Sequence, residues 1–512
     1  MNIKLTFKLH IEIFTLLKIQ LHISIKLNSH NTLFEMGRSR SYDLIVIGSG
    51  PAGEKAAVKA AYFGKKVALI EKSKDSGGAG VQTGTLPSKT LKETALYFSR
   101  VYEKHIFETD DIKPLHKTKH EQFTYRRDVA RNDMQDEVDK NLLRHNVDVY
   151  RGFASFVDEH NIKISGSEEL FISGKNILIA TGSYPVNPSD IPFDGKRIHD
   201  SDTILRISRF PKSLCVIGAG VIGCEYATIY AAMGVKVYLI NNRDKILPFL
   251  DSEIADALVT QMKKQGIEIL FNTSIVNYHL PAKKSGNIKL TLKNGDVLKT
   301  DMVLYAAGRS GNISGMNCGN AGIITGDRET VIVDENYRTN VPHIYAVGDV
   351  IGFPALASTS MDQGRVAITN MYHTNDFDSV HKVFPYGIYT VPEVSMVGMT
   401  EQDAVSRGIK YCTGISKVCD IARGKILGSP DDGFLKLVFE NDTKIILGVH
   451  IIGRIASELI HYGMTLVQDK KTLDNVIATV FNYPTFHDLY KYAAYDGLGN
   501  ISGKNIKNPR HP

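Results

Sequence analysis

Two glycine-rich loops, each between an apolar strand and a helix, constrain the fold of this chain more than any other feature. The first follows the apolar run 42–47 and reads G-S-G-P-A-G over residues 48–53, and the second follows 213–217 and reads G-A-G-V-I-G over residues 218–223. In such βαβ units the glycines permit a tight turn, close approach to a pyrophosphate, and close packing of helix on strand. The pair of loops predicts an α/β fold with two Rossmann-like dinucleotide-binding domains.

The two predicted units differ after their second strand, where an acidic side chain commonly binds a ribose. Glu71 stands there in the first unit, and Asn241, followed by Asn242 and Arg243, stands there in the second. A carboxylate repels the 2′-phosphate of NADP, whereas a neutral amide beside a guanidinium tolerates it. We therefore expect the second unit to accept both NAD and NADP. The alternative is that Arg243 is an ordinary surface charge.

The composition is that of a globular protein, with 43% hydrophobic residues, 23% charged residues and a formal net charge of +6. No window supplies the roughly 20 apolar residues of a membrane-spanning helix, and no dense cluster of Lys and Arg indicates a nucleic-acid face. Five cysteines without C-x-x-C or zinc spacing indicate reduced thiols. We predict a cytoplasmic protein with no metal and with neither membrane nor nucleic acid as a partner.

Residues 1–35 do not match the rest of the chain. They alternate apolar with Lys and His residues and then become polar, while Met36 directly precedes the first predicted strand. We interpret 1–35 as an extra segment outside the fold, with translation beginning at Met36. The alternative is a membrane-associating or targeting arm.

The remaining pattern predicts further elements. Long exposed helices are expected between 92 and 143, a small strand meander over 147–157 and 161–164, and a buried strand over 176–180. Residues 301–308 are expected to end the second unit, and 339–350 to return to the first. After residue 384, alternating strands and helices predict a separate α+β domain.

The order of the motifs resembles that of the flavin-dependent pyridine nucleotide-disulfide oxidoreductases over nearly all of 41–498. The motifs are the first glycine loop, G-G-x(10)-K over 77–89, A-T-G over 180–182, the second glycine loop with Glu225, G-R over 308–309, and A-V-G-D over 346–349. The resemblance implies an FAD-binding domain (36–183 and 310–383), an NAD(P)-binding domain (184–309) and a C-terminal dimerisation domain (384–500). It also implies a homodimer or higher homo-oligomer.

The resemblance implies FAD as cofactor, NAD and NADP as substrates, and a set of site residues. Lys89 and Glu225 are the candidate catalytic residues, as a buried pair that places positive charge near the flavin and helps stabilise its reduced anion. Asp349 is expected on the ribityl chain. The candidate cofactor-binding residues are Gly48, Gly50, Pro51, Ala52, Gly53, Glu71, Lys72, Gly78, Thr85, Ala154, Thr181, Gly182, Gly218, Gly220, Val221, Ile222, Gly223, Asn241, Arg243, Gly308, Arg309, Gly348, Asp349 and Ala357.

The chain departs from the disulfide reductases where those enzymes carry their sulfur chemistry. Gly80 and Thr85 occupy the positions of the two redox cysteines, so no thiolate or disulfide forms there. Tyr483 occupies the position of the thiol base, and a phenol rarely ionises near neutral pH. Because thiols and base are missing together, the pattern favours a coherent alternative function over a decayed reductase. His487 nearby is interpreted as an interface or surface residue.

Several segments are most similar to the soluble pyridine nucleotide transhydrogenase branch of the family, namely 83–93, 239–251, 308–312, 387–395 and 481–485. This similarity implies hydride transfer between NADPH and NAD through FAD, without a disulfide. Alternatives are an NAD(P)H oxidase or other-acceptor flavin reductase of the same fold, a disulfide reductase working through Cys215 and Cys224, and a non-catalytic flavin-binding protein.

Overall fold

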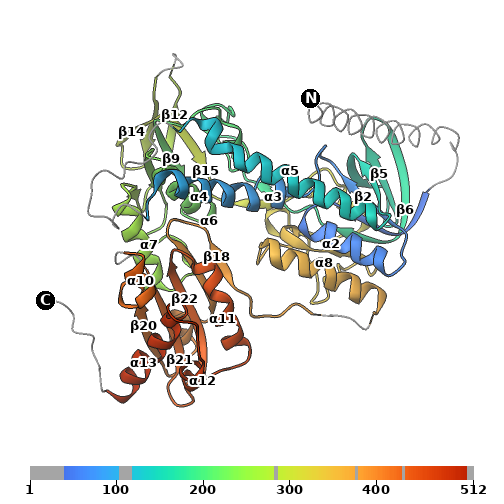
Figure 1. Cartoon of the computed structure of the whole chain (residues 1–512). Helices are drawn as coiled ribbons and strands as arrows, with labels where there is room; N and C mark the ends of the chain where they lie inside the picture. The colour runs from blue at the N-terminus through green and yellow to red at the C-terminus, as the bar shows by residue number, and fades with distance from the viewer. Residues whose placement is uncertain (1–39, 103–117, 282–285, 375–378, 429–432, 504–512) are drawn as a thin grey trace, which may run out of the picture.

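The computed structural model describes residues 40–102, 118–281, 286–374, 379–428 and 433–503, arranged as three α/β units (Figure 1). The predictions for 1–35, and the part of the predicted helical region at 103–117, lie outside these residues. Within the described part, no helix is both long and apolar enough to cross a membrane.

The first unit is built on a mostly parallel sheet with the order β3-β2-β1-β6-β5-β4, in which β17 also pairs with β6. Leu44, Ile45 and Val46 in β1 are fully buried, as expected of a central strand with both faces covered. The strands are β1 (Arg40–Ile47), β2 (Val67–Glu71), β3 (Asp148–Arg151), β4 (Phe153–Phe156), β5 (Asn161–Ser165), β6 (Glu169–Ile179) and β17 (Ile344–Ala346).

The meander prediction was partly wrong. β3 is a parallel strand beside β2, and only β4, β5 and the first half of β6 form the antiparallel meander. The strand expected at 176–180 is the second half of β6, which pairs in parallel with β1. The first half of β6 is exposed at residues 169–171, so its sequence lacks the continuous apolar run that marks the buried half.

Helices α2 (Pro51–Tyr62) and α8 (Ala357–Tyr372) of the first unit pack closely on each other. Gly364 permits this approach, because a Cβ at that position would overlap the carbonyl of Ala52. The segment before β3 forms α3 (Gly78–Gln82), α4 (Thr85–Ser99) and α5 (His120–Arg144). The expectation of exposed helices holds for much of α5 and fails for α4, whose inner face buries Leu91, Lys92 and Ala95.

The second unit repeats the plan, with the strand order β11-β10-β9-β15-β8. Its elements are β8 (Ile198–His199), β9 (Ser213–Ile217), α6 (Val221–Ala232), β10 (Lys236–Ile240), α7 (Ser252–Lys264), β11 (Glu268–Leu270) and β15 (Met302–Tyr305), with the antiparallel strands β12 (Ile275–His279), β13 (Ile288–Leu292) and β14 (Val297–Thr300). The chain enters and leaves this unit through two paired strands, β7 (Ser183–Pro185) and β16 (Arg309–Gly311).

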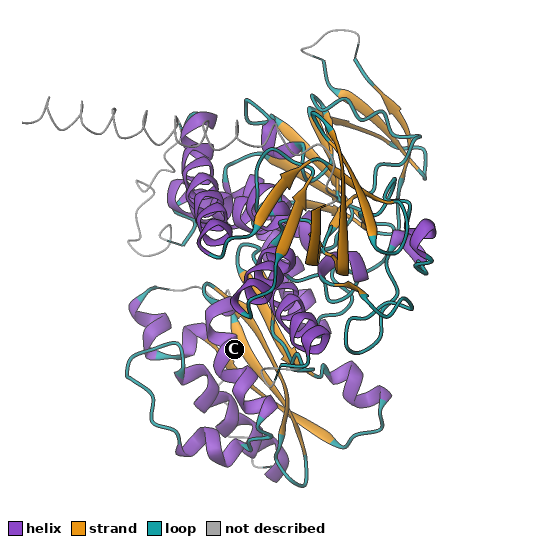
Figure 2. Ribbon diagram, turned by 90° about the vertical axis from the view of Figure 1, so that its right-hand side faces the viewer, coloured by secondary structure: helices purple, strands orange, loops and turns teal. Residues whose placement is uncertain are grey.

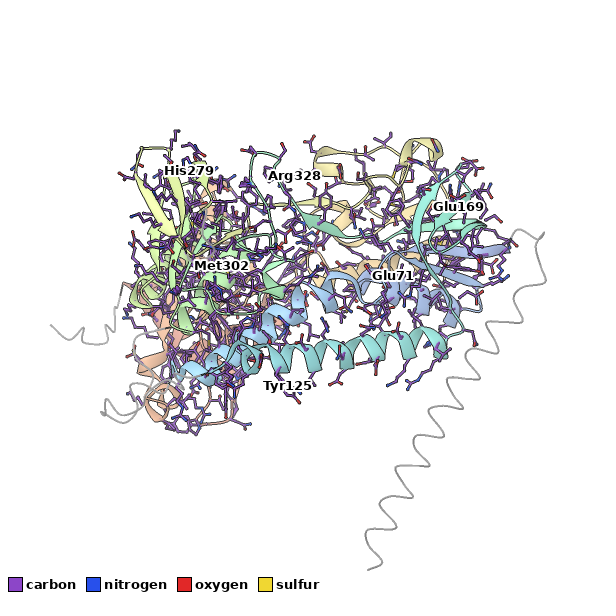
Figure 3. All side chains as sticks on the ribbon, turned by 90° about the horizontal axis from the view of Figure 1, so that it is seen from above. Glu71, Tyr125, Glu169, His279, Met302 and Arg328 are labelled. Atoms are coloured by element: carbon purple, nitrogen blue, oxygen red, sulfur yellow. The ribbon has the colours of Figure 1, made fainter. Side chains whose placement is uncertain are left out.

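In the view from above, the label of Glu71 lies on the sheet of the first unit and that of Met302 on the sheet of the second unit (Figure 3). The long helix α5 runs along one edge of the molecule, with the exposed Tyr125 pointing outwards. Because α4 packs on both α5 and α6, it bridges the first unit and the second.

The C-terminal unit is an antiparallel sheet covered by helices, as predicted (Figure 2). Its strands follow the order β18-β19-β22-β21-β20, and its fully buried core includes Leu435, Val449 and Tyr490. The elements are β18 (Tyr386–Ile388), β19 (Glu393–Gly398), α9 (Glu401–Ser406), β20 (Tyr411–Lys417), α10 (Ala422–Ile426), β21 (Phe434–Glu440), β22 (Ile446–Gly453), α11 (Ala456–Gln468), α12 (Leu473–Ala478) and α13 (Asp488–Ser502).

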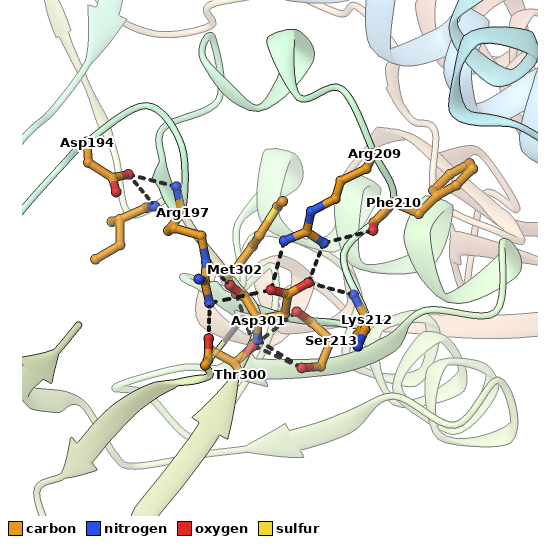
Figure 4. A network of polar contacts seen from close by, with 11 residues as sticks. Asp194, Arg197, Arg209, Phe210, Lys212, Ser213, Thr300, Asp301 and Met302 are labelled. Carbon is orange, nitrogen blue, oxygen red and sulfur yellow. Dashed lines mark hydrogen bonds and ion pairs between the residues drawn. The ribbon is translucent and has the colours of Figure 1, made fainter. Parts of the chain in front are cut away.

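The carboxylate of Asp301, directly before β15, is hydrogen-bonded to the segment that precedes β9 (Figure 4). Its two oxygens accept hydrogen bonds from Nη1 and Nη2 of Arg209 at 2.6 and 2.9 Å, and Oδ2 also accepts the backbone N–H of Lys212 at 2.9 Å. Arg197 lies 3.4 Å from Oδ1. The hydrogen bond from Arg209 is the largest influence on this carboxyl group and lowers its pKa.

We predict that Asp301→Asn destabilises the protein at pH 7 by about 1–3 kcal/mol, because charge-assisted hydrogen bonds to Arg209 are lost. A carboxyl whose pKa is lowered by folding contributes stability above its unfolded pKa of about 3.9, and that contribution disappears as pH falls through the folded pKa. The difference in urea midpoint between wild type and variant should therefore stay constant from pH 7 to about pH 5 and shrink as pH falls below about 4, towards the folded pKa. A difference independent of pH would contradict this account.

Candidate functional site

A cavity of about 760 Å³ opens where the three units meet, a volume typical of cofactor sites. Its wall combines the first glycine loop, the α3–α4 segment, the start of α6 and the β18 region. The predicted site residues that line it are Gly48, Gly50, Pro51, Ala52, Glu71, Lys72, Gly78, Thr85, Lys89, Ala154, Thr181, Gly182, Val221, Ile222, Glu225, Arg309, Gly348, Asp349 and Ala357. The predicted residues outside its wall are Gly53, Gly218, Gly220, Gly223, Asn241, Arg243 and Gly308.

The first glycine loop has the geometry that a pyrophosphate site requires. Gly48 has a φ of 106°, a left-handed conformation that disfavours side chains, and Gly53 packs so closely that a Cβ there would overlap the carbonyl of Gly48. Gly53 thus serves helix packing, which explains its place behind the cavity wall. No side chain caps the first turn of α2, so its N–H groups are open to an anion.

Glu71 ties the end of β2 to this loop. Its Oε2 accepts hydrogen bonds from the backbone N–H of Ser49 at 3.0 Å and from Ser49 Oγ at 2.7 Å, and its Oε1 accepts the N–H of Ser73 at 2.8 Å. The carboxylate also lines the cavity. Sequence reasoning placed Glu71 correctly at this wall and missed Ser49, whose hydroxyl also accepts the N–H of Gly77 at 3.1 Å.

The second glycine loop repeats the geometry of the first. Its glycines lie outside the cavity wall, whereas its residues Val221 and Ile222 line the cavity. Gly218 has a φ of 100°, a Cβ at Gly223 would overlap the carbonyl of Gly218, and no atom lies within 4 Å of a Cβ built at Gly220. The α6 helix begins directly afterwards, so its N-terminus is available to a second dinucleotide.

The side chain of Asn241 turns towards its own loop. Its Nδ2 donates hydrogen bonds to the carbonyls of Lys245 at 2.8 Å and Arg243 at 3.3 Å, and the residue is buried. Arg243 itself is exposed. The expected tolerance of a 2′-phosphate in this unit would therefore depend on the lack of a carboxylate at position 241 and on the Arg243 guanidinium, because the amide nitrogen of Asn241 is already engaged.

Lys89 and Glu225 form the ion pair expected between α4 and α6. Lys89 Nζ donates to both carboxylate oxygens of Glu225 at 2.9 Å and to Ser88 Oγ at 3.2 Å. Both residues line the cavity, and the Lys89 side chain, at 26% exposed against 4% for Glu225, is the more accessible member of the pair. A third partner of Glu225, the backbone N–H of Tyr389 at 3.0 Å, was not foreseen from the sequence.

Asp349 and Arg309 are linked through Ser183. Asp349 Oδ2 accepts a hydrogen bond from Ser183 Oγ at 2.9 Å, and the same hydroxyl oxygen accepts one from Arg309 Nε at 2.8 Å. Arg309 also lies 3.7 Å from Asp202, a carboxyl group whose pKa is raised mainly by burial. Ser183 and Asp202 line the cavity, and the sequence did not indicate either, because Ser183 opens the three-residue strand β7 and Asp202 lies in a turn, and neither segment is long enough to show a pattern.

The cavity fits the dinucleotide part and the ribityl part of FAD. The glycine cradle and the open N-terminus of α2 suit a pyrophosphate, and the carboxylates of Glu71 and Asp349 suit sugar hydroxyls. Thr181 Oγ1 is buried against the cavity and has no hydrogen-bond partner among the described residues. Buried polar atoms are normally satisfied, so this hydroxyl marks a place for a polar ligand atom.

The residues at the redox-cysteine positions also line the cavity, and they bring no sulfur to it. A Cβ at Gly80 would lie 2.6 Å from Pro51 Cγ, which leaves no room for a cysteine side chain without a shift of α3 against α2. Cys215 and Cys224 lie outside the cavity wall, and burial raises the pKa of both thiols well above the ordinary value. These findings argue against a reductase that works through them.

Tyr483, at the position of the thiol base of the disulfide reductases, and the nearby His487 both lie in the C-terminal unit. Tyr483 is 74% exposed in the chain, and His487 stacks on Phe481 and Tyr490. Burial lowers the pKa of His487, which favours the neutral imidazole. His487 is half-buried, and its interpretation as an interface or surface residue stays a prediction.

We predict that Gly80→Ala weakens FAD binding at least tenfold, because the added methyl group displaces Pro51 at the first turn of α2. Gly319→Ala is the matched control, since a Cβ at Gly319 meets nothing within 4 Å. Fluorescence titration of FAD into the apoproteins measures both. Equal affinities of the two variants would mean that the α2–α3 contact does not govern the cradle.

The comparisons with known proteins agree with this geometry. The family described as pyridine nucleotide-disulphide oxidoreductase matches residues 42–364, and its dimerisation domain matches residues 384–494. A soluble pyridine nucleotide transhydrogenase of Mycobacterium tuberculosis is 38% identical over 476 residues, covering 91% of this chain and 99% of the relative. The protein of the same name from Hahella chejuensis is 39% identical over 474 residues, covering 90% and 99%.

Two solved structures share the fold. The HOCl-induced flavoprotein disulfide reductase RclA from Escherichia coli, in its Cu(II) complex, superposes with a TM-score of 0.80 at 27% identity, covering 89% of this chain and 99% of that chain. LpdA from Mycobacterium tuberculosis gives a TM-score of 0.80 at 26% identity, covering 88% and 99%. The chain therefore belongs to the pyridine nucleotide-disulphide oxidoreductase family.

Proposed function

We propose that this chain is an FAD-dependent NAD(P) transhydrogenase, which moves hydride between NADPH and NAD through the flavin without a redox-active disulfide. One observation carries the proposal: the cavity retains the glycine cradle and the Lys89–Glu225 pair, while Gly80 and Thr85 bring no thiol to the same wall. The curated relatives named above, at 38% and 39% identity, support it.

In this proposal the chain supplies placement and electrostatics. FAD, when bound, supplies an acceptor for a hydride from one nicotinamide and a donor to the next. The first glycine loop and α2 hold its pyrophosphate, Asp349 holds the ribityl hydroxyls, and the ammonium of Lys89 adds positive charge at the cavity. The second glycine loop and α6 hold the nicotinamide dinucleotide, so that both substrates use one site in turn.

The proposed domains follow the sheet topology. An FAD-binding domain (36–183 and 310–383) would contain the first sheet, an NAD(P)-binding domain (184–309) the second, and a dimerisation domain (384–500) the third. The chain passes between the FAD-binding domain and the NAD(P)-binding domain twice, and the paired strands β7 and β16 lie at these two crossings.

A homodimer or higher homo-oligomer in the cytoplasm completes the proposal. The match of residues 384–494 to the dimerisation domain supports self-association. So do the exposed side chains of Val480 and Tyr483 on the C-terminal unit, which a second copy would cover. The buried thiols of Cys215 and Cys224 agree with a reducing compartment.

The function is tested by anaerobic mixing of the purified, yellow protein with NADPH and thio-NAD. We expect rapid formation of thio-NADH in the absence of any added thiol or disulfide. Flavin reduction without thio-NADH would instead favour an oxidase or other-acceptor reductase, and a protein that holds no FAD would favour a non-catalytic role.

The role of Lys89 is tested by Lys89→Ala. Removing a positive charge from the cavity should slow flavin reduction by NADPH at least tenfold, because the reduced flavin anion loses a stabilising charge. FAD should remain bound, since the cradle is untouched. Stopped-flow absorbance measures the reduction rate, and an unchanged rate with bound FAD would remove this role from Lys89.

A further inference from the structure

Tyr389 contacts both members of the Lys89–Glu225 pair. Its backbone N–H donates to Glu225 Oε1 at 3.0 Å, and Lys89 Nζ lies over its ring, 4.7 Å from the centroid. The residue follows β18 and lines the cavity beside the pair. A single residue of the C-terminal unit therefore touches the lysine of α4 and the glutamate of α6.

The ring adds an aromatic contact to the oxygen contacts of the ammonium group. Glu225 and Ser88 supply oxygen acceptors to Lys89 Nζ, at 2.9 Å and 3.2 Å. The ring adds the negative face of an aromatic quadrupole, which attracts a cation. A lysine head on a flexible stem has many rotamers, so a contact of this kind restricts where the charge lies.

The segment 389–393, which we call the junction segment, is itself held by both helices. Val391 N–H donates to Thr228 Oγ1 at 3.2 Å, one turn beyond Glu225 on α6. Glu393 pairs with Lys92, one turn beyond Lys89 on α4, with 2.5 Å between Nζ and Oε1.

The junction segment is also fastened to the C-terminal unit. Glu393 Oε2 accepts hydrogen bonds from the backbone N–H of Ser457 at 3.0 Å and from Ser457 Oγ at 2.5 Å. Burial raises the pKa of Tyr389, so its phenol stays neutral at physiological pH. The ring of Tyr389 thus has a fixed place and a fixed charge state.

We propose that Tyr389 is a positioning residue, which holds the Lys89 ammonium and the Glu225 carboxylate in place beside the flavin and so sets how readily the flavin is reduced. The inference rests on the FAD binding of the proposed function and is independent of the final electron acceptor. The proposal assigns the positioning of Lys89 to the ring of Tyr389 and gives no role to its hydroxyl group, which does not touch the pair.

The test compares Tyr389→Leu with Tyr389→Phe, which keeps the ring and serves as the matched control. The flavin reduction potential is measured anaerobically against a reference dye. We expect Tyr389→Leu to lower the ratio of reduced to oxidised flavin at a given potential about tenfold, which is about 30 mV for a two-electron couple, and Tyr389→Phe to leave it within twofold of wild type. In a Lys89→Met background the leucine substitution should have no further effect.

A second measurement separates this proposal from FAD binding itself. Acetylation of Lys89 by acetic anhydride, followed by mass spectrometry on the flavin-free protein, should be several-fold faster in Tyr389→Leu than in Tyr389→Phe. Equal acetylation rates in the two variants, or an equal potential shift with and without Lys89, would overturn the positioning role. A protein that shows the acetylation difference and binds no FAD would instead overturn the proposed function.

Discussion

The arrangement of the site depends on the buried ion pair between Lys92 and Glu393, whose side chains are 2% and 6% exposed. Removing two charges from water is costly, and the pair is tolerable because Ser457 also donates two hydrogen bonds to the carboxylate. An unpaired buried charge is strongly destabilising, so the pair favours the arrangement of α4 against β19 that keeps Lys92 and Glu393 together. That arrangement brings Tyr389 against the Lys89–Glu225 pair.

A second buried lysine fixes the other side of the C-terminal unit. Lys436 on β21 lies 2.8 Å from Asp251 at the start of α7, and 3.0 Å from Glu253 and from Glu401. The C-terminal unit is thus joined to α4 by one ionic contact and to α7 by another. The C-terminal sheet therefore contacts both loop-bearing units and adds to the direct bridge that α4 makes between them.

Local sequence patterns predicted much of this structure. The two glycine loops, the buried strands beside them and the α+β character after residue 384 follow from periodicity and from residues with special backbone freedom, such as Gly48. The choice of Lys89, Glu225 and Asp349 as site residues followed from the resemblance in motif order, and all three line the cavity. The contacts of Ser183 with Asp349, of Tyr389 with Glu225 and of Glu393 with Lys92 were not predictable, because each joins residues more than 100 positions apart and carries no local pattern. Asn241 shows that contacts between near neighbours can also escape prediction. Its residue type showed that the side chain is neutral, but only the fold shows that its amide group donates to the carbonyls of its own loop.

The order of the strands has a consequence for synthesis of the chain. The first sheet includes β1 near the start and β17 at Ile344–Ala346, while every strand of the second sheet lies between them in sequence. A chain emerging from the ribosome therefore releases all of the second sheet before the last strand of the first. The second unit can reach its native state while β6 still exposes an unpaired edge. That edge is available for wrong pairing until β17 arrives.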